Sequence, residues 1–461
     1  KKEGKMKREI FDLIILGAGP SGYLAAERAG KAKLKTLLIE KRKLGGVCLN
    51  EGCVPSKAFL NTAKIYDHAV GSEKLGVTVK NARIHQKTVV AHKDKIVQLL
   101  TSGIKSKLLK SKVKIVMGEG KILPKEDNLF KISVEGEEFF GKKFLLSTGS
   151  TSQIPPINGI ETAFKNSFAL TSREILDIDY IPQTLVVVGG GVVGLEMASY
   201  FCSAKARVFV VEMGDHIGGN IDSEVGEILK KSYEKKGVIF KLNAKVITIG
   251  EYFVEYEKEG EIFKIPCEKV LISIGRKPFI EGFGLENLSP IIENGCVKTD
   301  NKGQTSVVNL YAAGDVNGKL MLAHTAYRES EVVINNLLGI KDTMRYNAIP
   351  TVIYTNPEVA SVGYTEQMAR KEGIDVEVKK ISMMYSGRYV AEDGDPNGIV
   401  KLVINKKYDT LIGVTMIGNY ASEIIYGAGL MTEQEMRTKE IKELVFPHPT
   451  ISEIIKEALF S

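Results

Sequence analysis

The stretch FDLIILGAGPSGYLAAERA at residues 11–29 carries the strongest structural signal in the N-terminal part of the chain. It begins with an apolar run typical of a buried strand, passes through GAGPSG and ends in a helical pattern. Gly17, Gly19 and Gly22 occupy the G-x-G-x-x-G positions, where glycines let the turn approach a pyrophosphate that rests on the helix N-terminus. The next apolar run, KTLLIE, ends in Glu40, a carboxylate suited to binding ribose hydroxyls. Strand, turn, helix, strand and acid together predict a dinucleotide-binding unit.

The same arrangement occurs a second time, in TLVVVGGGVVGLEMASYF at residues 184–201. Gly189, Gly191 and Gly194 take the three glycine positions, and the strand-like run VFVVE ends in Glu212. In both copies 23 residues separate the first glycine from the acid. Glycine clusters that arise by chance rarely match in this way, so we expect the protein to bind two dinucleotides.

The second unit is expected to bind NAD rather than NADP. Gly194 and the carboxylate of Glu212 suit a free ribose 2′-hydroxyl, whereas the carboxylate repels a 2′-phosphate. Arg207 precedes the strand, where we do not expect it to reach that phosphate. For the first unit the indication is NLYAAGDV at residues 309–316, in which Asp315 is placed to hold a polyhydroxyl chain such as the ribityl chain of FAD. An ordinary turn or helix-cap aspartate is the alternative for Asp315.

Two of the five cysteines stand close together in GGVCLNEGCVPSK, residues 45–57. Residues five apart in a regular helix have Cα atoms about 8–9 Å apart, and a disulfide needs less than about 7 Å. A bridge between Cys48 and Cys53 therefore requires a break in the helix, which Gly45, Gly46 and Gly52 permit. A zinc site would need two more ligands nearby, and the stretch contains none. A redox-active disulfide is favoured over a structural disulfide or a metal site.

The electrostatic setting of this cysteine pair is ambiguous from the sequence. Pro55 fits the first turn of a helix, which would place Cys53 near the positive helix end, where a thiolate is stabilised. Glu51 opposes this by like-charge repulsion, and the residue types do not decide which effect prevails. The other cysteines lie far apart in the sequence and are expected to be buried structural thiols: Cys202, Cys267 and Cys296.

HPTISE at residues 448–453 supports two compatible interpretations. Thr450 and Glu453 have the T-x-x-E spacing of a capping box, and Pro449 ends the preceding segment. His448 is then either a loop histidine or a general base, because imidazole exchanges protons near neutral pH. A short capped helix would hold Glu453 beside the ring, where its carboxylate could orient the imidazole.

Length and composition predict about three domains in an ordinary globular protein, with 461 residues, 44% hydrophobic and 26% charged. No apolar run approaches the roughly 18 residues of a membrane span, and KKEGKMKREIF lacks the apolar core of a secretory signal, so we expect a cytoplasmic protein. Residues 1–9 supply +3 of the net charge of +7 and are expected to be a basic tail or linker of a processed chain. Lysines at 102–114 alternate with apolar residues, as on a solvated helix, so no nucleic-acid partner is expected.

With these motifs the chain resembles the class I pyridine nucleotide-disulfide oxidoreductases over nearly its whole length after about residue 9. Among the members of that family its disulfide motif is similar to the lipoamide type, whereas glutathione-type members usually carry Lys at Ser56 and Ala at Gly194. Ser147 and Phe446 depart from the Ala and His that are frequent in the family, which puts local packing in doubt. The motifs that carry the resemblance are GAGPSG, GGVCLNEGCVPSK, TGS (148–150), GGGVVGLE, SIGRKP (273–278), AAGDVNGKLMLAHTAYRE (312–329), IPTVIYTNPEVASVGYTE (349–366) and HPTISE.

The resemblance implies an α/β fold with two Rossmann-like dinucleotide-binding domains and an α+β C-terminal dimerisation domain. The implied division is an FAD domain at 10–150 and 276–348, an NAD domain at 151–275 and a dimerisation domain at 349–461, after the tail at 1–9. The implied cofactors are FAD and NAD, with no metal. The residues implied to bind them are Gly17, Gly19, Gly22, Glu40, Gly46, Lys57, Gly120, Thr148, Gly149, Asp315 and Ala323, and Gly189, Gly191, Gly194, Glu212, Val246, Gly275 and Arg276.

The resemblance also implies the reaction, in which dihydrolipoyl thiols reduce the Cys48–Cys53 disulfide and electrons pass through FAD to NAD. Cys48 would be the thiol attacked by substrate and Cys53 the thiolate facing the flavin. Lys57 would lie near the flavin and pair with Glu196, although a surface lysine is the alternative.

His448 and Glu453 would complete the site from the partner subunit of a homodimer. The implied protein partner is the lipoyl-bearing protein of a 2-oxoacid dehydrogenase or glycine cleavage complex. A disulfide or metal-ion reductase of the same family and a non-catalytic NADH-sensing flavoprotein remain alternatives.

Overall fold

The computed structural model describes residues 8–461, which form two compact units. The first comprises the chain up to Pro55 together with Ala91–Gln153 and Gly275–Arg345, and the second comprises Ser56–Val90, Ile154–Ile274 and Tyr346–Ser461. Residues 56–90 thus group with the second unit, whereas the sequence-based division places them in the first domain. Most of the expected basic tail, residues 1–7, lies outside the described residues. The assignment of domains to cofactors stays a prediction.

The first unit contains a sheet in the order β3-β2-β1-β6-β5-β4, with β19 paired to β6. Strands β1, β2, β3, β6 and β19 run parallel, and β4 and β5 form an antiparallel extension. The strands of this unit are β1 (Ile10–Leu16), β2 (Thr36–Glu40), β3 (Lys114–Met117), β4 (Gly120–Glu126), β5 (Leu129–Val134), β6 (Glu137–Leu146), β7 (Ser150–Ser152), β16 (Arg276–Pro278), β17 (Ile292–Glu293), β18 (Cys296–Val297) and β19 (Leu310–Ala312).

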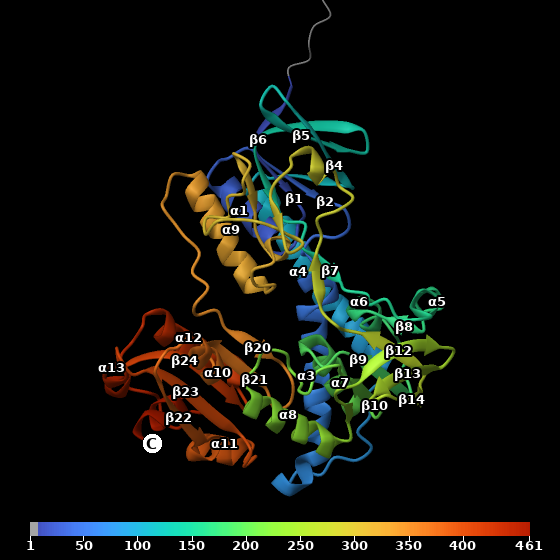
Figure 1. The fold of residues 1–461 in the computed structure, drawn as a ribbon, viewed down its shortest axis with the longest axis vertical. Coiled ribbons are helices and arrows are strands. Elements are labelled where there is room, and N and C mark those ends of the chain that lie inside the picture. The colour runs from blue at the N-terminus through green and yellow to red at the C-terminus, as the bar shows by residue number, and fades with distance from the viewer. Residues whose placement is uncertain (1–7) are drawn as a thin grey trace, which may run out of the picture. The chain divides into compact units, whose positions relative to one another are not determined.

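Both faces of this sheet are buried, as the uninterrupted apolar run of β2 predicts. Leu37 and Ile39 pack into one hydrophobic cluster, and Leu38, which points to the other face, packs into a second with alanines of α1. Helices α1 and α9 lie side by side (Figure 1). The helices and turns of this unit are α1 (Pro20–Lys31), α2 (Gly46–Glu51), most of α4 (Gln86–Lys110), α9 (Ala323–Leu337) and the 3₁₀ turns Leu285–Asn287 and Asp315–Asn317.

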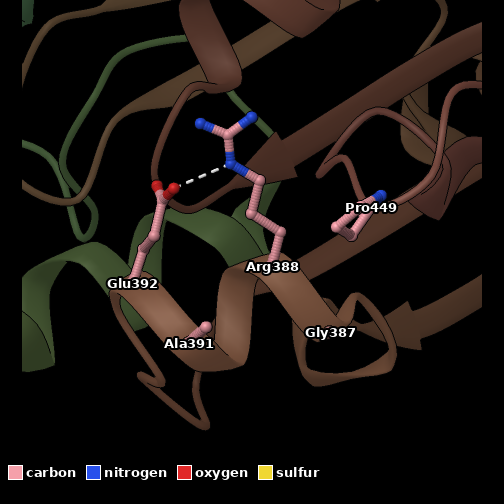
Figure 2. A pocket seen from close by; sticks show the side chains of 5 residues that line it. All are labelled: Gly387, Arg388, Ala391, Glu392 and Pro449. Atoms are coloured by element: carbon pink, nitrogen blue, oxygen red, sulfur yellow. Dashed lines mark hydrogen bonds and ion pairs between the residues drawn. The ribbon is translucent and has the colours of Figure 1, made fainter.

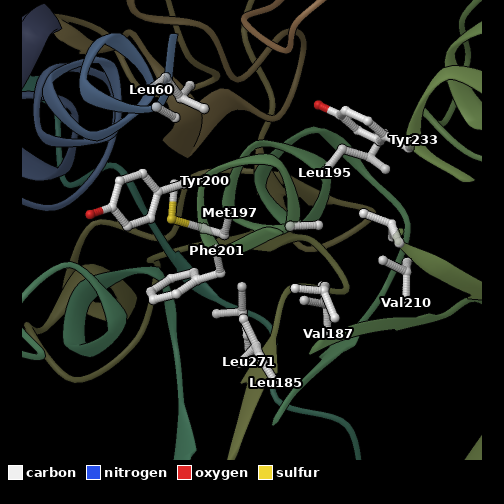
Figure 3. Packing of buried hydrophobic residues seen from close by; sticks show 14 of the residues in the cluster. Leu60, Leu185, Val187, Leu195, Met197, Tyr200, Phe201, Val210, Tyr233 and Leu271 are labelled. Carbon is white, nitrogen blue, oxygen red and sulfur yellow. The ribbon is translucent and has the colours of Figure 1, made fainter. Parts of the chain in front are cut away.

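The second unit repeats the parallel arrangement in a sheet of order β11-β10-β9-β15-β8, beside a three-stranded meander β12-β13-β14. Helix α7 packs Leu195, Met197, Tyr200 and Phe201 over strand residues such as Val187 (Figure 3). The elements of this part are α3 (Cys53–Gly71), Ser72–Leu75 (3₁₀), α5 (Ile160–Lys165), β8 (Ala169–Leu170), α6 (Ser172–Ile175), β9 (Thr184–Val188), α7 (Val192–Ser203), β10 (Arg207–Val211), α8 (Ser223–Lys236), β11 (Ile239–Lys241), β12 (Lys245–Gly250), β13 (Phe253–Lys258), β14 (Glu261–Pro266) and β15 (Lys269–Ile272).

The C-terminal part of the second unit is an antiparallel sheet, β20-β21-β24-β23-β22, on which helix α12 packs. Lys401 of β23 forms a buried ion pair with Asp222, the N-cap of α8, at 2.8 Å. The elements are β20 (Thr351–Ile353), β21 (Val359–Gly363), α10 (Glu366–Lys371), β22 (Val376–Ser382), Met383–Tyr385 (3₁₀), α11 (Gly387–Glu392), β23 (Ile399–Asn405), β24 (Thr410–Ile417), α12 (Ala421–Glu433), α13 (Thr438–Glu443) and α14 (Ile454–Phe460).

The two parallel sheets with flanking helices and the C-terminal antiparallel sheet confirm the predicted α/β class with an α+β C-terminal part. Among the helices of residues 8–461, none is long and apolar enough to cross a membrane.

Candidate functional site

The first glycine turn joins β1 to α1 through contacts that exclude side chains. Gly17 has φ +98°, and a Cβ there would lie 2.2 Å from the backbone oxygen of Ser147, which follows β6. A Cβ on Gly22 would lie 1.8 Å from the Gly17 carbonyl oxygen. Near the same turn, a Cβ on Gly46 would lie 2.5 Å from the Cα of Gly19, so the start of α2 packs directly against the turn. Gly17, Gly22 and Gly46 are therefore required, because at each position neighbouring backbone atoms lie too close to leave room for a side chain.

The second turn, between β9 and α7, repeats these contacts in the second unit. A Cβ on Gly189, at φ +104°, would lie 2.6 Å from the backbone oxygen of Ser273, and one on Gly194 would lie 2.3 Å from the Gly189 carbonyl oxygen. Gly191 has no described atom within 4 Å of the position its Cβ would take, so open space lies at the N-terminus of α7.

The acids at the ends of β2 and β10 each bind two backbone N–H groups. Glu40 accepts hydrogen bonds from Ala18 N and Arg42 N, both at 2.8 Å. Glu212 accepts hydrogen bonds from Gly190 N and Gly214 N, both at 2.7 Å. Each carboxylate is thereby held against the glycine turn of its own unit.

The residues at both turns fit the groups that the motifs imply. Within residues 8–461, no side chain caps the N-terminus of α1 or α7, so the first N–H groups of both helices are left for phosphate oxygens. In the first turn of α9, the hydroxyl of Thr325 is 1% exposed and has no hydrogen-bond partner among the described protein atoms. The first unit would hold FAD along α1 and α9, and the second would hold NAD along α7.

Asp315 is fixed by a short polar chain within the first unit. Ser150 Oγ donates to Asp315 Oδ2 at 2.5 Å, and Arg276 Nε donates to Ser150 Oγ at 2.7 Å. The 3₁₀ turn that Asp315 begins has Gly314 as its N-cap and no side-chain cap. Asp315 is therefore no helix cap, but it does lie in a turn, as the other alternative held, and its carboxylate is partly exposed and oriented by Ser150. Its role toward FAD stays a prediction.

The TGS segment and its neighbours lie together in the first unit. Thr148 Oγ1 donates to the Phe279 carbonyl at 2.7 Å, and Phe279 N donates to the carbonyl of Gly149 at 2.9 Å. Gly275 accepts a backbone hydrogen bond from Gln153, and Ala323 is the first residue of α9. Of the TGS residues, Ser150 contacts Asp315 directly.

Two predicted cofactor residues have packing roles in the structure. Gly120 begins β4, where a Cβ would lie 2.9 Å from side-chain atoms of both Ile132 and Leu16. Val246 of β12 is 6% exposed and packs into a hydrophobic cluster of the second unit. Close packing accounts for the glycine at position 120. The side chain of Val246 is buried, so only its backbone is left to contact a ligand. Their cofactor roles stay predictions.

The cysteine stretch contains the helix break that the sequence predicted. Cys48 lies in α2, and α3 begins at Cys53, with Gly52 between them at φ −147° and ψ −110°. Pro55 stands in the first turn of α3, as expected. Glu51 forms an ion pair with Arg42, which lies outside GGVCLNEGCVPSK. The pairing offsets the repulsion that Glu51 was expected to exert on a thiolate at this helix end.

A tyrosine pair lies within electrostatic range of both cysteines in the first unit. The hydroxyls of Tyr23 on α1 and Tyr327 on α9 are 2.5 Å apart, and their rings meet edge to face. Burial raises the pKa of both tyrosines, and the charges of Cys48 and Cys53 add to the rise. The raised pKa keeps both hydroxyls protonated well above the neutral range.

Lys57 and Glu196 form the expected ion pair in the second unit. Lys57 Nζ of α3 lies 3.0 Å from both carboxylate oxygens of Glu196 on α7. The Glu196 side chain is 5% exposed and that of Lys57 34%. The surface-lysine alternative for Lys57 is thus wrong, because its ammonium binds a buried carboxylate.

His448 and Glu453 also lie in contact, but the local helix differs from the expectation. His448 Nδ1 is 3.1 and 3.2 Å from the two carboxylate oxygens of Glu453, and the ring is 78% exposed. Helix α14 begins only at Ile454, and the Thr450 hydroxyl binds Pro447 O and Ser452 Oγ. The capping box is therefore only half formed, through the Thr450 N–H bond to Glu453 at 3.3 Å.

A surface hollow of about 470 Å³ opens beside the residue that follows His448. Figure 2 shows Pro449 at its edge and Arg388 bonded to Glu392, with Nε and Oε1 2.7 Å apart. The remaining lining residues are Gly387 and Ala391. No predicted cofactor residue lines this hollow, so it does not mark either dinucleotide site.

The remaining cysteines and the two departures from the family pattern have plain structural roles. Cys267 is 5% exposed, as expected for a structural thiol, but Cys202 and Cys296 are only half-buried, because each lies near the surface with its Sγ bonded to a backbone carbonyl. Ser147 is buried and its hydroxyl lies 3.0 Å from that of Ser21. Phe446 packs against the hydrophobic cluster of the C-terminal part. Ser147 and Phe446, the two departures from the family pattern, are thus both accommodated in the local packing.

Three residues at these sites lie within motifs of the family resemblance, but the sequence alone assigns no role to any of them. Tyr354 contacts both Lys57 and Glu196, Tyr327 joins Tyr23, and Ser150 orients Asp315. Each of them contacts a segment far away in the chain. The motifs therefore point to these stretches of the chain, but a local pattern could not have revealed the contacts that the three side chains make.

Family models match almost the whole chain. The model described as "Pyridine nucleotide-disulphide oxidoreductase" matches residues 11–330, and its "dimerisation domain" matches residues 349–459. The dihydrolipoyl dehydrogenase of Mycoplasma genitalium is 37% identical over 98% of this chain and 99% of its own. That of Bacillus subtilis is 36% identical over 97% of both chains, and the mitochondrial enzyme of Sus scrofa is 35% identical over 97% of this chain and 89% of its own.

Solved structures share the fold over the full length. LpdA from Mycobacterium tuberculosis superposes with a TM-score of 0.88 and 24% identity, covering 97% of this chain and 98% of its own. The HOCl-induced flavoprotein disulfide reductase RclA from Escherichia coli gives a TM-score of 0.86 and 24% identity over 98% of this chain and 99% of its own. At these identities the structures establish the fold alone.

Proposed function

The chain belongs to the pyridine nucleotide-disulphide oxidoreductase family, and from that premise we propose that it is an FAD- and NAD-dependent enzyme that oxidises dihydrolipoyl groups. The observation that carries the proposal is the full-length similarity to dihydrolipoyl dehydrogenases, combined with the Cys48–Cys53 stretch at a broken helix. In the overall reaction a dihydrolipoyl dithiol and NAD⁺ give a lipoyl disulfide, NADH and one proton.

The cysteine pair carries the thiol–disulfide exchange. A substrate thiolate attacks Sγ of Cys48, the Cys48–Cys53 bond breaks, and Cys53 leaves as a thiolate. The second thiolate of the substrate then attacks the substrate sulfur that is bonded to Cys48 in the mixed disulfide. This attack releases Cys48 and closes the lipoyl ring. Cys53, at the N-terminus of α3, is stabilised as a thiolate by the helix end, and Arg42 offsets the charge of Glu51.

FAD, when bound, would supply the redox chemistry that links the reduced cysteines to NAD. The chain's own contribution to this step is binding and charge. The turn at Gly17 and the carboxylate of Asp315 would hold FAD, and the turn at Gly189 with Glu212 would hold NAD. Lys57, fixed by Glu196, supplies a positive charge one turn beyond Cys53 in the same helix.

His448 is the base that takes the proton of the incoming substrate thiol, and Glu453 orients its ring. We assign this histidine to the site of a second copy, so that the active form is a homodimer joined through the dimerisation domain. The support is the family match at 349–459 and the exposure of the His448 ring.

The protein partner belongs to the same proposal. The lipoyl-bearing protein of a 2-oxoacid dehydrogenase or glycine cleavage complex would deliver the dithiol, in the cytoplasm. A lipoyl group on a flexible arm suits the exposed position of His448.

A substrate comparison tests the function. The FAD-loaded protein is assayed with dihydrolipoamide and NAD, and in parallel with glutathione disulfide and with metal ions in the presence of NADH or NADPH. We expect kcat/KM for dihydrolipoamide with NAD to exceed every other combination by at least about 100-fold, or about 2.7 kcal/mol. Comparable or faster turnover of another disulfide or a metal ion would assign the chain to a different reaction of the family.

A further inference from the structure

Three segments of the second unit meet around one positive charge. Lys57 lies on α3, Glu196 on α7, and Tyr354 in the segment that follows β20. The Lys57 ammonium lies 4.1 Å from the centre of the Tyr354 ring, and the backbone N–H of Tyr354 donates to Glu196 Oε1 at 3.1 Å. Tyr354 therefore contacts both members of the ion pair, one through its ring and the other through its backbone.

We propose that Tyr354 is a positioning residue that holds the Lys57 side chain in the geometry set by Glu196. The proposal rests on the proposed function and adds a residue to it. An aromatic ring attracts a cation over its face, and the attraction grows as water is excluded. The N–H bond to Glu196 orients the carboxylate, so that its oxygens both face Lys57 at 3.0 Å.

The Tyr354 backbone is held on both sides in sequence. Ile353 is 3% exposed and packs into the hydrophobic cluster of the parallel sheet, and the Thr355 hydroxyl donates to the Pro357 carbonyl at 2.6 Å. The position of the ring over Lys57 is thus determined by anchored neighbours.

Core packing does not explain the side chain itself. Tyr354 is 37% exposed, so its ring contributes little to the buried core. The Lys57 contact requires the ring but not the phenolic hydroxyl, because the cation lies over the ring face. Phenylalanine should therefore replace tyrosine here, whereas an aliphatic residue of similar size should not.

Lys64 offers a matched control on the same helix. Its side chain is 35% exposed, close to the 34% of Lys57, and it lies 4.0 Å from Glu358 and 5.7 Å from the ring centre of Tyr420. A substitution at Tyr354 should leave Lys64 unaffected, and Tyr420→Leu should leave Lys57 unaffected.

The first test measures the reactivity of individual lysines. Native FAD-loaded protein is treated with a limiting amount of acetic anhydride, which acylates only the neutral amine, and acetylation of Lys57 and Lys64 is quantified by mass spectrometry. We expect Tyr354→Leu to raise the acylation rate of Lys57 about fivefold without changing that of Lys64, because the ring no longer covers the amino group of Lys57. Tyr354→Phe should match wild type at both lysines.

The second test measures turnover of dihydrolipoamide with NAD. Tyr354→Leu should lower kcat about tenfold with KM little changed, because Lys57 is displaced from its position without loss of substrate contacts. Tyr354→Phe should restore kcat to within about twofold of wild type. Thermal unfolding checks that the variants are folded, and Tyr354→Met serves in place of Tyr354→Leu if the latter does not fold.

Equal Lys57 acylation in wild type and in the folded Leu or Met variant would overturn the proposal, as would a Phe variant that behaves like Leu. These outcomes are independent of the proposed reaction. If wild type fails to oxidise dihydrolipoamide, the proposed function is wrong, and the acylation result still decides the role of Tyr354.

Discussion

Glu40 and Glu212 make the same pair of backbone hydrogen bonds in the two nucleotide-binding units. Each accepts one N–H from the residue after the first glycine of its turn, Ala18 or Gly190, and one from the residue two positions beyond the acid itself. The first glycine and the acid are equally spaced in the two units, and in both units the acid accepts the same two backbone hydrogen bonds. Each carboxylate thereby supports the turn of its own unit, and its binding of ribose hydroxyls stays a prediction.

Replacement of Glu212 should affect both roles. Glu212→Ala removes the acceptor of two backbone N–H groups, so we expect a loss of about 1–2 kcal/mol in the free energy of unfolding and a KM for NAD raised about tenfold. Glu212→Gln keeps one acceptor oxygen, so its unfolding free energy and its KM for NAD should lie between those of the wild type and Glu212→Ala. Steady-state kinetics and denaturant unfolding measure the two effects, and the FAD content should stay at the wild-type level. A wild-type protein equally efficient with NADP would contradict the ribose argument.

A methyl group on Gly22 should disrupt the first turn. Its Cβ would lie 1.8 Å from the Gly17 carbonyl oxygen, which the backbone can relieve only by moving the turn. We expect Gly22→Ala to lower the free energy of unfolding by about 3 kcal/mol and to lower the FAD-to-protein ratio. Gly103→Ala is the matched control in α4, where no described atom lies within 4 Å of the new Cβ, and it should stabilise the protein by about 0.5–1 kcal/mol. Thermal unfolding and the flavin absorbance ratio distinguish them; full FAD binding by a stable Gly22→Ala protein would refute the close-approach argument.

Cys48→Ser and Cys53→Ser should separately abolish oxidation of dihydrolipoamide, because thiol–disulfide exchange needs both sulfurs. Transfer of electrons from NADH to an artificial dye should persist in both variants, since it does not use the disulfide. Cys202→Ser, at a half-buried thiol of the second unit, is the control and should keep its lipoamide activity. Full dihydrolipoamide turnover in either of the first two variants would contradict the redox role of the pair.

Complementation between inactive subunits tests the shared site. Cys48→Ser and His448→Gln homodimers should each be inactive, whereas a refolded mixture should regain about one quarter of wild-type activity, because half of randomly paired dimers contain one intact site. Activity is measured after mixing, with subunit exchange checked by mass spectrometry. Inactive heterodimers in which both variants are folded and loaded with FAD would show that His448 does not act across the dimer.

The reactivity of Cys267 should distinguish it from the redox pair. Burial raises the pKa of the Cys267 thiol to about 12, so the thiol stays protonated in the folded protein. Its contribution to stability is complete below the unfolded thiol pKa of about 8.5 and is lost as the pH rises toward the folded value. Iodoacetamide at pH 8 should modify reduced Cys48 and Cys53 but not Cys267, as measured by peptide mass spectrometry. Between pH 8 and pH 10, wild type should lose more unfolding free energy than Cys267→Ala; an equal loss would contradict the raised pKa.

Sequence alone determined the features that depend on neighbours in the chain. Apolar runs, glycine spacing and terminal acids establish two α/β nucleotide-binding units, because strand and helix periods and turn geometry are local properties. The break between Cys48 and Cys53 follows in the same way, from helix geometry and the position of glycine. The resemblance to a family then supplied the order of the domains and the pairing of Lys57 with Glu196.

Tertiary structure decided what depends on segments that meet only after folding. The charge of Glu51 is offset by Arg42, Asp315 is oriented by Ser150, and Tyr354 lies between the two residues of an ion pair. Side-chain electrostatics and hydrogen bonds act over a few ångströms in space, whatever the separation in sequence, so no local pattern encodes these partners.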